Sequence, residues 1–210
     1  MHPALLAAAC LVLAAGAGFG IYARWVAAKP YSVTLESGDT LVYAYNRSVH
    51  QTAAQHDVML PEGVQSRNLT ADELQTLFAP LGAITEQDSA FASFRVENGA
   101  AFYLEGTVGG VRIHLAEAGF PVSDTVIVGE ETACTVMGTA VKTGYTLTKP
   151  NSNGVRTAIF CAQFEMNGGT VYTELAGAET NREQLSEQLS ETVCRMISTQ
   201  TPDLSAVRYK

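Results

Sequence analysis

The feature that most constrains this chain is an uncharged apolar run near its start. Residues 4–23 read ALLAAACLVLAAGAGFGIYA and contain no Asp, Glu, Lys or Arg. About 20 apolar residues, each rising 1.5 Å, span the roughly 30 Å hydrocarbon core of a bilayer. Tyr22 and Trp25 lie at the far end, where aromatic rings favour the membrane interface, and Arg24 and Lys29 end the run. The run predicts one N-terminal transmembrane anchor.

A cleaved signal peptide is the alternative to an uncleaved anchor. Ala15-Gly16-Ala17 and Val26-Ala27-Ala28 supply the small residues that a signal-peptide cleavage site needs. A signal peptide also favours a basic start, and only His2 and the α-amine are available before the run. We expect an anchor, and the sequence leaves cleavage of residues 1–28 open.

The charges beside the run oppose the orientation that we expect. Arg24 and Lys29 follow the run and neither Lys nor Arg precedes it, which places the rest of the chain in the cytoplasm by the positive-inside rule. We still expect the domain outside the cytoplasm, since three residues are an unusually short start for the opposite orientation. A cytoplasmic segment ahead of Met1 would restore the usual charge bias. Gly16 and Gly20 are four residues apart, a spacing that lets two membrane helices touch and self-associate.

The remainder of the chain is acidic. Residues 30–210 hold all 21 Asp and Glu but 11 of the 13 Lys and Arg, which gives a formal charge of −10. That charge excludes nucleic acid binding through bulk attraction to phosphates. The sequence therefore divides into an anchor with its juxtamembrane segment, residues 1–29, and one soluble acidic domain, residues 30–210.

Hydrophobic periodicity predicts an α+β domain. Strands are expected over 31–35, 40–49, 94–97, 101–105, 111–115, 125–128, 132–148, 155–166 and 170–175, with a loop over 50–68. Turns are expected at Asn98-Gly99, Gly109-Gly110 and Asn167-Gly168-Gly169, which join neighbouring strands as hairpins. The predicted fold is a twisted antiparallel sheet of about six to nine strands with two amphipathic helices. The two strand–glycine turn–strand units match poorly in their side chains, so they read as separate hairpins rather than as a repeat.

Both helices begin with a capping-box pattern, a hydroxyl followed three residues later by a glutamate. The first runs from Thr70 towards Pro80 and Gly82, and the second begins near Thr180. Their apolar stripes consist of Leu74, Leu77, Phe78 and Leu81 in the first helix, and Leu185, Leu189, Val193, Met196 and Ile197 in the second. The residues after Pro202 are expected to be an extended tail.

Candidate catalytic and metal-binding residues are few, and none forms a known pattern. His50, His56 and Asp57 lack the spacing of a helical metal site. His114 alternates with Ile113 in a predicted strand, so it is expected to face solvent. Cys161 lies in an apolar strand and is expected to be a buried, inert thiol. The sequence therefore predicts no catalytic, cofactor-binding or metal-binding residue, and no cofactor.

Three cysteines lie in the domain, Cys134, Cys161 and Cys194. They are too few and too irregularly spaced for a zinc site or a disulfide framework. A bond between Cys161 and Cys194 stays open, since the last helix could pack on the strand that carries Cys161. Cys10 has too little apolar sequence before it to be the acylated cysteine of a lipoprotein.

Residues 144–197 read GYTLTKPNSNGVRTAIFCAQFEMNGGTVYTELAGAETNREQLSEQLSETVCRMI. This succession of strand, loop, aromatic strand, Asn-Gly turn, Val-Tyr strand and helix resembles the extracytoplasmic C-terminal domain of unknown function in Gram-positive anti-sigma-factor-like membrane proteins. In that family the domain follows one transmembrane helix, and the resemblance carries over no catalytic residue. Residues 1–210 contain no sigma-binding or zinc-finger part like that of a full anti-sigma factor.

These observations predict a membrane-anchored, extracytoplasmic domain with a binding or sensing role, such as anti-sigma-like regulation. Two alternatives remain. A curved sheet lined by aromatic residues could hold a lipid or a peptide. An enzyme could assemble its site from residues with no sequence signature, in which case a cleft would bring His, Cys or acidic residues together.

Overall fold

The computed structural model describes residues 29–46, 62–118 and 133–209. Contacts divide the chain into two units, with the boundary between Pro30 and Tyr31. Within the described ranges, no helix is both long enough and apolar enough to cross a bilayer. The following sequence features lie outside these ranges: the predicted anchor 4–23, Gly16 and Gly20, Cys10, the strand 125–128, and His50, His56 and Asp57.

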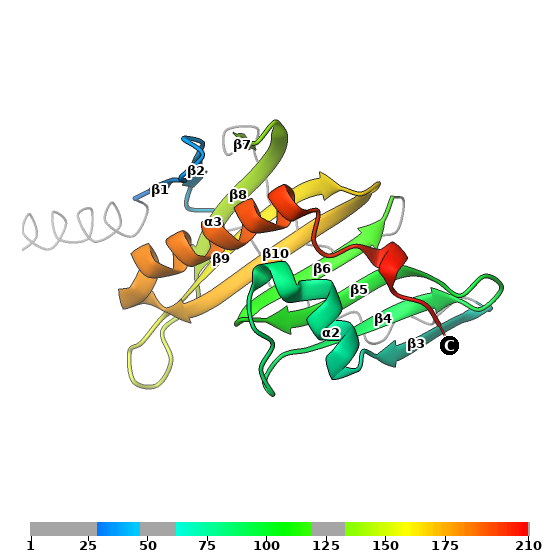
Figure 1. Ribbon diagram of the computed structural model, residues 1–210. Coiled ribbons are helices and arrows are strands. Elements are labelled where there is room, and N and C mark those ends of the chain that lie inside the picture. Colours follow the sequence, from blue (N-terminus) through cyan, green and yellow to red (C-terminus); the bar gives the residue numbers. More distant parts are fainter. Residues whose placement is uncertain (1–28, 47–61, 119–132, 210) are drawn as a thin grey trace, which may run out of the picture. The chain divides into compact units, whose positions relative to one another are not determined.

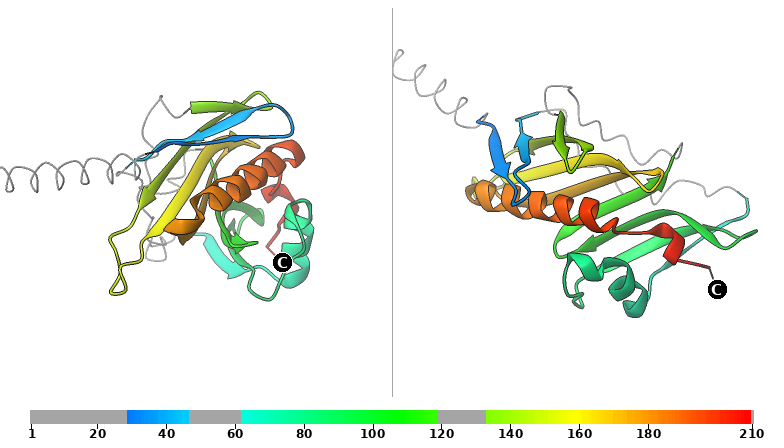
Figure 2. Two further views of the ribbon diagram at one scale, coloured as in Figure 1. Left: turned by 90° about the vertical axis from the view of Figure 1, so that its left-hand side faces the viewer. Right: turned by 45° about the horizontal axis from the view of Figure 1, so that its top comes forward.

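One antiparallel sheet holds eight strands in the order β3-β4-β5-β6-β10-β9-β8-β7. The strands are β3 Val64–Asn68, β4 Ser89–Arg95, β5 Ala100–Val108, β6 Val111–Glu117, β7 Ala133–Val136, β8 Thr139–Leu147, β9 Thr157–Met166 and β10 Gly169–Ala178. The sheet thus consists of two four-stranded meanders that join where β6 pairs with β10 (Figure 1). Helices α2 (Ala71–Phe78) and α3 (Arg182–Thr199) lie on one face of it (Figure 2). The α+β, antiparallel prediction is confirmed.

The two central hairpins are related by a local two-fold axis. In the β5–β6 hairpin, Glu105 pairs with His114. The equivalent pair in the β9–β10 hairpin, 58 residues later in the chain, is Gln163 and Tyr172. His114 and Tyr172 also pair with each other across β6 and β10. The axis therefore passes between these two residues, although the side chains of the two hairpins differ.

The turns of both hairpins lie where they were predicted, except that Gly169 belongs to β10 and not to the turn, and each turn has two residues with positive φ. Gly109 and Gly110 have φ values of 57° and 79°, and Asn167 and Gly168 have values of 53° and 73°. Positive φ at both central positions matches the right-handed twist of the flanking strands, and glycine and asparagine adopt it at little cost.

The main core lies between the sheet and the helices. Val111, Ile113 and Leu115 of β6 alternate towards it and are buried. All five residues predicted for the stripe of α3 are buried in the same core, namely Leu185, Leu189, Val193, Met196 and Ile197. Burying one such side chain stabilises the fold by about 1.5–3 kcal/mol. The stripe prediction is confirmed.

The two helices begin differently. In α2, Thr70 Oγ1 accepts the Glu73 backbone N–H at 3.3 Å and Glu73 Oε2 accepts the Thr70 N–H at 2.9 Å, which is the predicted capping box. The predicted box of α3 is wrong. Residues Glu179–Asn181 form the 3-10 helix η3, so α3 starts after Asn181, whose side chain makes no capping hydrogen bond. The extra turn moves the Thr180 hydroxyl away from the amides it would cap.

A two-stranded sheet, β1 (Tyr31–Thr34) and β2 (Thr40–Tyr43), packs beside α3 and the β7–β8 end of the large sheet. The Tyr31 ring meets the Tyr145 ring edge-on at 5.3 Å between centroids. The Arg182 guanidinium lies 5.6 Å from the Tyr31 ring centre. Since Arg182 is the first residue of α3, these contacts join the beginning of the domain to the beginning of that helix.

Other differences from the predictions follow from local chemistry. The expected loop 50–68 ends in β3, a polar edge strand that has no alternating apolar residues to mark it. The expected strand 132–148 is two strands, because Met137 and Gly138 turn the chain with positive φ. The β4–β5 connection takes four residues, 96–99, rather than the two expected at Asn98-Gly99.

Candidate functional site

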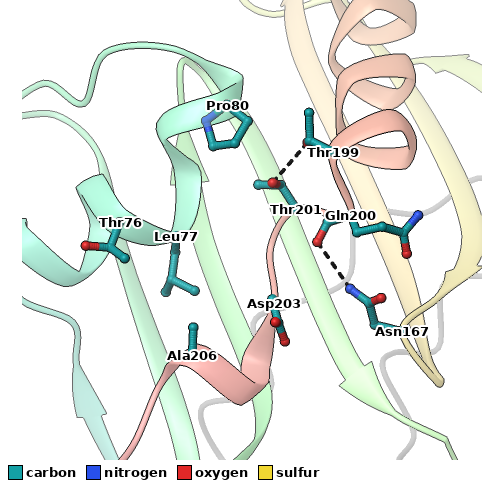
Figure 3. A pocket seen from close by; sticks show the side chains of 9 residues that line it. All are labelled: Thr76, Leu77, Pro80, Asn167, Thr199, Gln200, Thr201, Asp203 and Ala206. Atoms are coloured by element: carbon teal, nitrogen blue, oxygen red, sulfur yellow. Dashed lines mark hydrogen bonds between the residues drawn. The ribbon is translucent and has the colours of Figure 1, made fainter.

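Two neighbouring cavities lie where the chain leaves α3. The first has a volume of about 230 Å³ and the second about 240 Å³. Lining the first are Thr76, Leu77, Pro80, Asn167, Thr199, Gln200, Thr201, Asp203 and Ala206 (Figure 3). Lining the second are Ala100, Ala101, Leu115, Glu117, Asn167, Gly169, Asp203, Leu204, Ser205 and Arg208. Asn167 and Asp203 belong to both linings, so the two cavities adjoin.

The end of α3 sets the path of the chain between the cavities. Gln200 adopts the left-handed conformation that ends the helix, and the Thr201 N–H donates to the Met196 carbonyl at 3.0 Å. The Asn167 side-chain Nδ2 donates to the Gln200 carbonyl at 3.2 Å, which ties the β9–β10 turn to this point (Figure 3). The Asn167 Oδ1 atom then remains as an acceptor at the border of the two cavities.

Asp203 turns the chain again. Its Oδ1 accepts the Ser205 N–H at 2.9 Å and starts the 3-10 helix η4 (Leu204–Ala206). Sequence reasoning predicted an extended tail after Pro202 and therefore missed this segment. An Asp followed two residues later by Ser is a weak signal for such a turn, and it becomes meaningful only once the cavities are known.

The cavity walls combine polar and apolar groups. In the first cavity, Leu77 and Ala206 point towards one another, and Thr199 and Thr201 present hydroxyls from the other side (Figure 3). Asp203 is common to both cavities, and the second cavity adds charged groups from Glu117 and Arg208. Neither lining includes a histidine or a cysteine. Such a lining can hold a small polar molecule.

A second group of polar residues is buried on the sheet face opposite the helices. Glu105 Oε2 accepts the Tyr103 hydroxyl at 2.9 Å, and Glu105 Oε1 accepts an Arg112 N–H at 2.6 Å. The His114 Nδ1 lies 3.3 Å from the Tyr103 hydroxyl, and its Nε2 lies 3.6 Å from Glu105 Oε1. His114 is only 1% exposed. The prediction that His114 faces solvent is wrong, because this face of the sheet is buried too.

A second Tyr–Glu pair lies on β10, the strand that pairs with β6. Glu174 Oε2 accepts the Tyr172 hydroxyl at 2.9 Å, two residues before it on β10, just as Tyr103 donates to Glu105 on β5. The His114 ring lies between the two pairs, 5.7 Å from the Tyr172 ring. The pattern Tyr-x-Glu in two strands is the sequence signal that could have identified this cluster.

Burial determines the ionisation of His114, whereas hydrogen bonds and neighbouring charges determine that of Glu105. It lowers the pKa of His114 to about 4, even though the Glu105 carboxylate favours the protonated imidazole. Burial alone would raise the pKa of Glu105, but the Arg112 hydrogen bond, His114 and the Tyr103 hydroxyl outweigh it, so this pKa is lowered. Near pH 7 the cluster therefore holds a carboxylate, a guanidinium and a neutral imidazole.

The prediction that Cys161 is buried is confirmed. Its thiol is 0% exposed and donates to the Gly144 carbonyl at 3.4 Å, and burial raises its pKa well above that of a free thiol. A protonated, buried thiol is a poor nucleophile. Cys161 and Cys194 are both free, so the bond left open by the sequence is absent.

His114, the two carboxylates of the cluster and Cys161 do not line either cavity. Across the part of the chain that the structure describes, no group of three or more His, Cys, Asp or Glu is placed to hold a metal ion. The geometry supports ligand binding at the cavities and a structural role for the cluster. Comparisons with protein-family models, with characterised proteins and with solved structures find no match to this chain.

Proposed function

We propose that this protein is a membrane-anchored, extracytoplasmic binding or sensing domain whose ligand site is the pair of cavities. Residues 4–23 form the anchor, and Gly16 and Gly20 offer it a surface for self-association. Like the anti-sigma-factor-like domain that residues 144–197 resemble, it would report binding rather than catalyse a reaction. The observation that carries the proposal is the shared border of the two cavities at Asn167 and Asp203.

The size of the cavities supports this proposal. Ligand sites usually measure about 300–1,000 Å³, which neither cavity reaches alone but the two would reach together. Hydroxyl, amide and carboxylate groups in the linings can fix the orientation of a small molecule by hydrogen bonds. The many polar groups do not suit a lipid chain, so the lipid-holding alternative is less well supported.

The cavities lie at one end of helix α3. Tyr31 lies beside Arg182 at the other end, where the helix starts. Helix α3 has 18 residues, which corresponds to about 27 Å at 1.5 Å per residue, and its last residue, Thr199, lines the first cavity. The cavities thus lie at the end of α3 that is remote from the contact between Arg182 and Tyr31.

A thermal-shift screen of the full chain in detergent micelles tests this proposal. The probes are small polar compounds at millimolar concentration, and a bound compound raises the melting temperature by mass action. We expect compounds that stabilise the natural chain and lose this effect in Ala206→Trp, in which an indole fills the first cavity. Glu187→Trp, on the exposed face of α3, is the matched control and should keep the effect.

Two results would contradict the proposal. One is that no compound raises the melting temperature of the natural chain. The other is that every stabilising compound acts equally on Ala206→Trp, which would place binding elsewhere on the protein.

A further inference from the structure

The second cavity contains two opposite charges that do not pair with each other. Asp203 and Arg208 both line it, and within the described residues neither forms an ion pair. The third charged group of the lining, Glu117, is already paired with Arg95. The cavity therefore offers one carboxylate and one guanidinium to a ligand.

The backbone holds these two charges apart. Asp203 is fixed by the hydrogen bond from the Ser205 N–H at the start of η4. Arg208 lies beyond η4, where it forms a β-bridge with Ala100 and its carbonyl accepts an N–H of Arg67 at 3.0 Å. Since both ends of the segment are tied, a ligand can contact both charges without first breaking an ion pair.

We propose that the paired cavities bind a small zwitterion, an amino acid or a short peptide with a free ammonium and a free carboxylate. The ligand ammonium donates to the Asp203 carboxylate and to Asn167 Oδ1, which are both at the border of the cavities. The ligand carboxylate accepts hydrogen bonds from Arg208, whose planar guanidinium suits a bidentate contact. This inference rests on the proposed ligand site and adds the chemical class of its ligand.

The first cavity then holds the uncharged part of the ligand. Leu77, Pro80 and Ala206 give it an apolar wall, and the hydroxyls of Thr199 and Thr201 face that wall (Figure 3). A ligand with a small apolar side chain, such as an alanine peptide, suits this combination.

Calorimetric titration of the full chain in detergent micelles with alanine, dialanine and trialanine tests the ligand class. Each peptide is compared with its N-acetylated form, which lacks the ammonium, and its C-terminal amide, which lacks the carboxylate. We expect at least one of the three to bind saturably, and both blocked forms of it to bind at least tenfold more weakly.

Substitutions then identify the two contacts. Asp203→Asn should weaken binding of the free peptide at least tenfold and reduce the difference between the free and N-acetylated forms. Arg208→Gln should do the same for the amide. Asp72→Asn and Arg195→Gln change exposed residues of the same types outside the cavities and should leave the affinity unchanged. Asp203 also starts η4, so Asp203→Asn could fail to fold. In that case Arg208→Gln alone tests whether the ligand is a zwitterion.

The outcomes separate this inference from the proposed function. If blocked and free forms bind equally, or if Arg208→Gln changes nothing, the zwitterion assignment is wrong. If none of these probes binds while other compounds bind in a manner sensitive to Ala206→Trp, the ligand class is wrong and the ligand site stands. If no compound is sensitive to Ala206→Trp, both proposals are wrong.

Discussion

At the scale of single residues, His114 combines deep burial with an unsatisfied polar atom. Its ring lies between two Tyr–Glu pairs, beside the two-fold axis, and its Nε2 has no hydrogen-bond partner among the described residues. A buried polar atom left without a partner costs about 1–3 kcal/mol. A neutral imidazole makes this cost smaller than a buried imidazolium would, which agrees with the lowered pKa of about 4.

This lowered pKa makes stability depend on pH. Between about pH 6.5 and pH 4 the unfolded chain protonates His114 and the folded chain does not, so the unfolded state binds more protons and stability falls as the pH falls. The shift corresponds to roughly 3 kcal/mol at most. Urea unfolding of His114→Phe should therefore show a flatter loss of stability over this range than the natural chain.

Glu73→Gln is the matched control for His114→Phe. The Arg67 hydrogen bond lowers the pKa of Glu73 to about 2, so its stabilising effect is lost below about pH 4.5, where the unfolded carboxyl protonates. This variant should keep the slope of the natural chain between pH 6.5 and pH 4.5. An equal slope in His114→Phe and the natural chain would show that His114 is protonated in the folded state.

At the scale of secondary-structure elements, the two helices differ in how their first turns are capped, and alanine substitutions test this difference. Thr70→Ala removes the hydroxyl that caps α2 and should lower the free energy of unfolding by about 1 kcal/mol. Thr180→Ala makes the same chemical change in η3, where the hydroxyl caps no amide, and should cost less than about 0.5 kcal/mol. Both free energies are measured by urea unfolding. Equal losses in the two variants would show that Thr180 caps α3, as the sequence predicts.

The buried stripe of α3 gives a second test at this scale. Leu189 is 0% exposed, so Leu189→Ala should lower the free energy of unfolding by about 2–5 kcal/mol through lost burial and a residual cavity. Glu187→Ala, on the exposed face of the same helix, should change it by less than about 0.5 kcal/mol. Similar values for the two variants would mean that α3 does not pack through this face.

What the sequence could predict depends on how far apart the interacting residues lie. The hairpin turns at Gly109-Gly110 and Asn167-Gly168, the α2 capping box and the α3 stripe were predictable because each uses residues close together in the chain. The burial of His114 was not, since a strand's alternation shows only that its two faces differ. Nor were the cavities, since Asn167 and Asp203 meet only when the β9–β10 turn packs against the end of α3.

At the scale of the whole molecule, the domain separates stability from binding. The polar cluster lies on the sheet face opposite the helices, and the cavities lie at the end of α3 that is remote from Tyr31. The two meanders that pair at β6 and β10 form the sheet, and the segment after α3, tied at both ends, supplies the proposed binding groups.

The central claim is that the cavity is open to the space outside the cytoplasm. A membrane-impermeant thiol reagent applied to intact cells that produce the full chain with Ser205→Cys tests it directly, because Ser205 is exposed and lines the second cavity. The natural chain corrects for Cys134 and Cys194, and Ser190→Cys is a fully buried control. The account predicts equal labelling of Ser205→Cys in intact and in permeabilised cells. Labelling only after permeabilisation would contradict it.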